Sequence, residues 1–143
     1  MASKVKSVKF LVVWEDWNLY ALSDSKILKI KSPVSRINIE EITDDVRKPR
    51  YAVDYDFMMK IEGEIDLHKP SDDPRIKQED IVQEINFQLM QVRPQIYYMD
   101  ELREILIIRP SIQKIFSTTK YDMKGYPIYT GDFSVGVTAV KIP

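Results

Sequence analysis

The chain contains no cysteine, four glycines and a single histidine among its 143 residues. Without cysteine it has no disulfide, no thiolate metal ligand and no cysteine nucleophile. The few glycines leave little room for the glycine-rich loops that hold phosphate groups, and neither common pattern of such loops occurs. The Gly-x-Ser-x-Gly motif of one large group of serine hydrolases is missing as well. The sequence therefore identifies no catalytic residue and no cofactor.

Long apolar runs and a large net charge are also missing. No stretch approaches the ~20 apolar residues of a membrane span, and no apolar run follows the Met-Ala-Ser start as it does in a signal peptide. We therefore expect a cytoplasmic or intracellular protein, or a virion component, without a membrane partner. The formal net charge is −1, whereas a general nucleic-acid binder carries a basic excess. No specific nucleic-acid partner is predicted.

The charges that are present are distributed unevenly. Residues 1–36 contain seven Lys or Arg and three Asp or Glu, residues 54–84 contain four and ten, and residues 109–143 contain five and two. The two ends are thus basic and the middle is acidic. The length fits a single domain over residues 1–143. Acidic and basic segments of this kind are able to attract one another between copies of the chain.

Residues 53–67 carry the most regular pattern. The odd positions from Val53 to Leu67 are apolar or small, and the even positions are mostly acidic, with Met58 as the exception. A period of two predicts a β-strand with one buried face and one acidic, solvated face. At ~3.3 Å per residue this strand would extend about 50 Å, two to three times the usual length. We expect another strand to pair along most of it.

Residues 74–92 fit one main helix. Asp72 or Asp73 is suited to cap it, and Pro74 suits its first position. One apolar stripe covers a sector of roughly 100°, the width of a core-facing stripe; it consists of Ile81, Val82, Ile85, Leu89 and Val92. A second strip lies nearly opposite and consists of Ile76, Phe87 and Met90. A helix with two apolar strips is either buried on both sides or in contact with another chain.

The remaining segments are mostly strand-like. Residues 4–14 form a strand with apolar residues on both faces, which favours a central or partly covered position. Residues 27–31 and 36–40 are further strands, and residues 126–142 form a C-terminal hairpin. Residues 100–108 form either a short helix capped by Asp100 or a buried strand, and Pro110 ends it in both cases. The predicted fold class is α+β, with an antiparallel, sandwich-like or barrel-like β-sheet.

The acidic segment offers the only candidate metal ligands. Paired carboxylates bind Mg²⁺ or Ca²⁺, and Glu62, Glu64, Asp66 and the lone His68 stand close together in the sequence. The string Gly63-Glu64-Ile65-Asp66-Leu67 resembles the metal-binding strand of restriction-endonuclease-like nucleases. That resemblance implies that Asp66 binds the metal and that a Glu-x-Lys strand follows, but no Glu-x-Lys sequence follows here. The alternative to a metal site is the solvated face of an amphipathic strand.

Three functions from different classes remain open. The first is a non-enzymatic structural or interaction subunit that self-associates through β-edges and a helix face, such as a ring or tube component of a virus or phage-like particle. Its predicted interface residues are Asp54, Asp56, Glu62, Glu64, Ile76, Phe87 and Met90. The second is a metal-dependent nuclease that uses the 62–68 segment. The third is an acidic protein that mimics nucleic acid and inhibits a partner with a basic surface.

Overall fold

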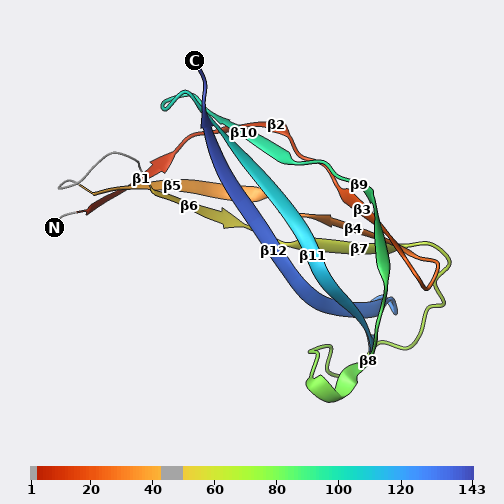
Figure 1. The fold of residues 1–143 in the computed structure, drawn as a ribbon. Coiled ribbons are helices and arrows are strands. Elements are labelled where there is room, and N and C mark those ends of the chain that lie inside the picture. Colours follow the sequence, from red (N-terminus) through yellow and green to blue (C-terminus); the bar gives the residue numbers. More distant parts are fainter. Residues whose placement is uncertain (1–2, 43–49) are drawn as a thin grey trace.

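The computed structural model describes residues 3–42 and 50–143, and nearly all of this part of the chain is antiparallel β-structure (Figure 1). The first seven strands are β1 (Ser3–Val8), β2 (Leu11–Trp14), β3 (Asn18–Leu22), β4 (Ile27–Lys31), β5 (Val34–Ile42), β6 (Arg50–Tyr55) and β7 (Met58–Glu62). After a 3-10 turn, η1 (Gln78–Asp80), follow β8 (Ile81–Glu84), β9 (Phe87–Gln91), β10 (Gln95–Met99), β11 (Glu104–Tyr121) and β12 (Pro127–Lys141).

The strands form three sheets. The first sheet has the order β1-β5-β6, the second β12-β11-β10-β2 with β8 also paired to β11, and the third β7-β4-β3-β9. Several strands that follow one another directly in sequence belong to different sheets, as β4 and β5 do. The chain therefore makes long extended runs that bend from one sheet into another, a device found at the corners of β-sandwiches.

Short breaks mark the places where a run changes sheet. The run through β4 and β5 breaks at Ser32 and Pro33, and the run through β6 and β7 breaks at Asp56 and Phe57. The two breaks lie side by side, because the backbone N–H of Asp56 donates to the carbonyl of Pro33 at 3.0 Å. Proline has no N–H to donate to a ladder, so it suits such a bend.

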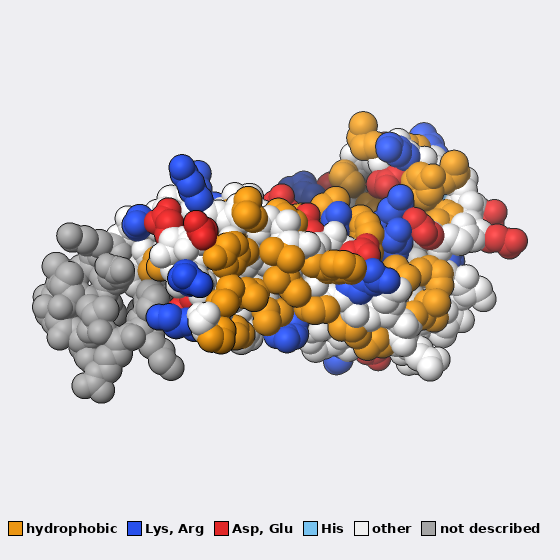
Figure 2. Space-filling view, turned by 90° about the horizontal axis from the view of Figure 1, so that it is seen from above, with side chains coloured by type: hydrophobic (Ala, Val, Ile, Leu, Met, Phe, Trp, Pro, Cys, Tyr) orange, Lys and Arg blue, Asp and Glu red, His pale blue; other side chains and the backbone are white. Residues whose placement is uncertain are grey.

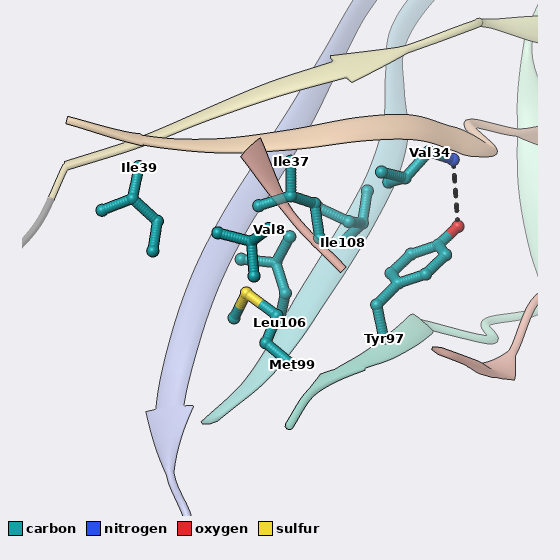
Figure 3. Close-up of a cluster of buried hydrophobic side chains, with 8 residues drawn as sticks. All are labelled: Val8, Val34, Ile37, Ile39, Tyr97, Met99, Leu106 and Ile108. Atoms are coloured by element: carbon teal, nitrogen blue, oxygen red, sulfur yellow. Dashed lines mark hydrogen bonds between the residues drawn. The ribbon is translucent and has the colours of Figure 1, made fainter. Parts of the chain in front are cut away.

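The hairpin of β11 and β12 crosses both of the other sheets diagonally (Figure 1). The end of the hairpin away from its turn, where β11 begins and β12 ends, packs on the β1-β5-β6 sheet. The core there buries Ile37, Tyr97, Leu106 and others (Figure 3). The end of the hairpin near its turn packs on the β7-β4-β3-β9 sheet around a second core that includes Leu28, Ile30 and Ile115. The two cores give a two-layer sandwich in which a single hairpin is shared by both halves.

The prediction of one strand over residues 53–67 is wrong. The segment consists of β6, a break at Asp56 and Phe57, and β7, after which Gly63 and Glu64 form a bend and the chain continues without strand structure. β6 pairs with β5, whereas β7 pairs with β4 in another sheet. The alternation of apolar and acidic residues continues through the bend, which is why the sequence pattern did not reveal it.

The predicted main helix over residues 74–92 is also wrong. Only η1 is helical there, and the chain then forms β8 and β9. From Ile81 to Gln91 the less exposed side chains include Ile81, Ile85 and Phe87, all at odd positions, whereas the even positions are exposed. The segment therefore has a period of two as well as the helical spacing, and pairing with β11 and β3 selected the strand.

Of the two alternatives for residues 100–108, the structure shows the buried strand. Residues 100–103 form a turn, and β11 begins at Glu104 and buries Leu106 and Ile108, so there is no helix over 100–108. Pro110 does not end the strand but lies inside it, where β11 has β12 on one side and neither β10 nor β8 on the other. A missing N–H costs little at such an unpaired position. The hairpin expected within residues 126–142 is instead the β11–β12 pair.

The α+β fold class is consequently wrong, because the described residues contain only one short 3-10 turn besides strands and loops. The antiparallel arrangement of the sheet is confirmed.

Within residues 3–42 and 50–143, no helix has both the length and the apolar character needed to cross a membrane.

Candidate functional site

The acidic side chains of the 53–67 segment do not form one surface. Asp54 lies exposed on β6 and Asp56 lies exposed at the break, both in the half of the molecule formed by the β1-β5-β6 sheet. Glu62 lies at the end of β7 in the other half, where its carboxylate is 3.4 Å from the Lys29 ammonium and 3.6 Å from that of Lys60. The bend between the sheets divides the acidic face, and two lysines neutralise one end of it.

The candidate metal ligands lie mostly in a loop. Glu64 is in the bend after β7, and Asp66 and His68 follow in an exposed segment without strand structure. The imidazole ring of His68 stacks on Tyr121 with 4.4 Å between ring centroids. Across the part of the chain that the structure describes, no three His, Asp or Glu side chains are grouped as a metal site would require. The geometry therefore adds no support to the nuclease hypothesis.

The three apolar residues predicted at an interface have different surroundings. Ile76 is half-buried in the loop before η1. Phe87 points inward and meets the ring of Tyr20 edge-on at 5.6 Å. Met90 is exposed on β9. Of the three, Met90 alone is available to a partner without rearrangement.

The most exposed apolar segment is β2. All four of its side chains, Leu11 to Trp14, are between 46% and 65% exposed. β2 pairs with β10 on one side, and no strand in the described ranges pairs with its other side. Figure 2 shows hydrophobic side chains gathered across the middle of the face on which Figure 1 places β2 and β10. The single strand predicted over residues 4–14 is therefore wrong: it is divided into β1 and β2, which belong to different sheets, and β2 is an exposed edge rather than a central or covered strand.

Trp14 continues this apolar surface into a shallow groove. The groove has a volume of about 210 Å³ and is lined by Trp14, Val92, Arg93, Pro94 and Ile96. The guanidinium of Arg93 lies 5.5 Å from the centroid of the Trp14 ring, within the range of a cation–π contact. The same guanidinium is 3.1 Å from the Asp16 carboxylate. These contacts hold Trp14 at the end of the free edge.

The second free edge belongs to β12. This strand pairs with β11 over its whole length, and no other strand among the residues described pairs with it. Its segment from Phe133 to Val140 contains no charged residue. Phe133 and Val135 face the two cores, whereas Val137 and Val140 are exposed. Sheet edges in natural proteins are normally protected by charged residues, proline or bulges, and the segment from Phe133 to Val140 has neither charge nor proline; Lys141 is the first charged residue after it.

A buried polar network lies beside the C-terminal end of β2 and joins β10 to the break between β4 and β5. At the break between β4 and β5, the Gln95 side chain bonds both backbone groups of Ser32, at 2.6 Å each. The Tyr97 hydroxyl accepts hydrogen bonds from the backbone N–H of Val34 at 3.2 Å and from Gln95 at 2.7 Å (Figure 3 shows the first). It donates to the Glu15 carboxylate at 2.6 Å. Side chains thus satisfy backbone groups that no strand pairs with, so the split between the sheets is stable.

Burial and the neighbouring Glu15 carboxylate raise the pKa of Tyr97 to about 12. The ordinary value is 10.0, so Tyr97 stays neutral and keeps its proton on the bond to Glu15 at neutral pH. Glu15 directly follows Trp14 in sequence. The network therefore fixes the C-terminal end of β2, and with it the direction of the free edge.

Sequence patterns missed these edges for two different reasons. The absence of charge from Phe133 to Val140 is visible in the sequence and could have pointed to the β12 edge. The exposure of Leu11 to Trp14 has no such signal, because four apolar residues in a row are typical of a covered strand. A comparison of the chain with protein-family models, curated proteins and solved structures found no match.

Proposed function

We propose that the protein is a non-enzymatic structural subunit that associates with copies of itself through its free strand edges. The observation that carries the proposal is β2, an edge strand whose four consecutive side chains are all apolar and all exposed. Such a strand presents unpaired backbone groups together with apolar side chains, and both are satisfied when another strand is added to the sheet.

The surroundings of β2 support a surface used in association. Val92, which lines the groove beside Trp14, is also exposed, so the apolar area extends beyond the edge itself. Large exposed apolar areas on small proteins commonly mark interaction sites. A ring or tube of a virus or phage-like particle is the assembly we favour, because identical subunits that meet through two different edges build closed rings or open helices.

The proposal does not depend on the length of the 53–67 segment or on a helix face, since that segment is divided and the helix is absent from the described chain. The acidic residues have no defined part in it either. Lys29 and Lys60 lie beside Glu62, which weakens the negative field that a mimic of nucleic acid would need.

The mass in solution tests the proposal. We expect light scattering between micromolar and millimolar concentrations to show a mass that rises above that of one chain, and Leu11→Lys to shift this rise to higher concentration. Lysine on an edge strand opposes pairing because its ammonium must lose water. Met123→Lys is the control, because Met123 is even more exposed to solvent than Leu11 (88% against 65%) but lies in the turn after β11. A strict monomer at all concentrations would contradict the proposal.

A further inference from the structure

We infer that the β12 edge of one copy pairs with the β2 edge of the next copy, so that the β12-β11-β10-β2 sheet continues from subunit to subunit. This inference rests on the proposed self-association and specifies which surfaces meet. The partner is a second copy of the chain, and the contact is head-to-tail, with a different edge from each copy.

The strand directions allow this continuation. Each strand in the order β12-β11-β10-β2 is antiparallel to its neighbour. Because the path contains four strands, β2 at one edge runs antiparallel to β12 at the other edge. A second copy placed beside the first in the same orientation therefore brings its β12 antiparallel to the first copy's β2. No copy has to be turned over for the sheet to continue as a regular antiparallel ladder.

The two edges also lie at the same level along the sheet. In register, Leu11 lies opposite Tyr98, and Tyr98 lies opposite Ile105. Ile105 in turn lies opposite Val140 on β12. Directly opposite residues in an antiparallel pair point to the same face. Leu11 and Val140 are therefore at the same height and on the same face, so a sideways shift brings Leu11 of one copy opposite Val140 of the next.

The chemistry of the two edges matches as well. Leu11 is 65% exposed and Val140 is 45% exposed, and the residues next to them on both strands, Val12 and Ala139, are also apolar and exposed. One contact of this kind covers β2 and the uncharged outer end of β12 in every subunit of an assembly. A symmetric dimer through a single edge would leave the other uncharged edge uncovered. The right-handed twist of the sheet rotates each copy relative to the last, which produces a ring or a helical tube.

Cysteine cross-linking tests the pairing directly, because the native chain has no cysteine. We would prepare Leu11→Cys and Val140→Cys as separate proteins, mix them under mild oxidation and resolve the products on non-reducing gels. Opposite residues in an antiparallel pair have Cα atoms about 4.5–5.5 Å apart, within the range of a disulfide. Both positions are exposed, so neither change should disturb folding. Ser134→Cys is the control, because Ser134 is exposed on the same face of β12 but six residues from Val140.

The expected result is a covalent dimer in the mixture of Leu11→Cys with Val140→Cys and at least tenfold less with either protein alone or with Ser134→Cys as partner. The double variant should give a ladder of covalent oligomers. Covalent dimers of one variant alone would show a symmetric edge contact and overturn the inference. No cross-link in a preparation that associates by light scattering would also overturn it, but would leave the proposed function standing. Wild-type protein that stays monomeric would refute the proposed function itself.

Discussion

Replacing Tyr97 by Phe removes one hydroxyl group from the network behind β2 and leaves the ring in place. The ring is completely buried and meets Phe10 edge-on at 5.6 Å, so apolar packing should be nearly unchanged. The hydroxyl, in contrast, accepts from Val34 and Gln95 and donates to Glu15. The substitution therefore measures the free energy of the polar network separately from that of the apolar core.

The size of the loss follows from the partners left behind. The buried N–H of Val34 loses its acceptor, and leaving a buried donor unsatisfied costs about 1–3 kcal/mol. The Glu15 carboxylate loses a donor, and a hydrogen bond to a charged group contributes about 1.5–3 kcal/mol. Gln95 keeps its bond to the Ser32 carbonyl. Since losses within one network do not add fully, we expect the free energy of unfolding to fall by about 3 kcal/mol.

Urea unfolding at pH 7, followed by the fluorescence of Trp14 and Trp17, measures this loss. With an m-value of about 2 kcal/mol per molar urea, the midpoint should move down by about 1.5 M. Tyr98→Phe is the matched control, because Tyr98 is the next residue on β10 but its hydroxyl contacts only the exposed Asp100 carboxylate at 3.1 Å. We expect less than about 0.5 kcal/mol for the control. Equal losses in the two variants would refute the role given to the network.

The same variant has a predicted signature at alkaline pH. Because the pKa of Tyr97 is raised from 10.0 to about 12, the folded protein keeps this proton between those values while the unfolded chain releases it. The contribution to stability is therefore complete below pH 10 and is lost as the pH rises through 12, by up to about 1.4 kcal/mol per pH unit. In Tyr97→Phe the free energy of unfolding should therefore fall less steeply with pH in this window, whereas Tyr98→Phe should change the steepness much less.

The remaining predictions concern β12. Gly131→Ala should destabilise the protein by about 3 kcal/mol or prevent folding, because a Cβ there would lie 2.1 Å from the Lys114 carbonyl oxygen. Gly136→Ala is the control, because the nearest atom to a Cβ there is 3.8 Å away. In urea unfolding its free energy should differ from that of wild type by less than about 0.5 kcal/mol. Burial and the Asp24 carboxylate raise the pKa of Tyr129, so its contribution also falls as the pH rises above 10. Tyr129→Phe should flatten the alkaline unfolding profile, and an unchanged profile would contradict the raised pKa.

Local patterns in the sequence determined several of the strands. The strand predicted at residues 27–31 coincides with β4, and that predicted at 36–40 lies within β5. Residues 36–40 alternate apolar and polar side chains strictly, and residues 27–31 alternate from Leu28 onward, so the period of two favours a strand in both. Connections of hairpin length outnumber helical crossovers in the predicted element order, and this predicted the antiparallel sheet that the structure shows.

Contacts between distant segments decided the rest. Residues 81–91 have apolar side chains at both helical and strand spacing, and they become β8 and β9 because β11 and β3 offer them open ladder positions. Pro110 stays inside β11 because no neighbour needs its N–H at that point. The free edge at β2 depends on how the chain is divided between the sheets, and Gln95 and Tyr97 on β10 stabilise this division by bonding the backbone at the junction of β4 and β5, far away in the sequence. Hydrogen bonds between residues so far apart in sequence leave no local periodicity, and therefore only the folded structure could show where the sheet remains open.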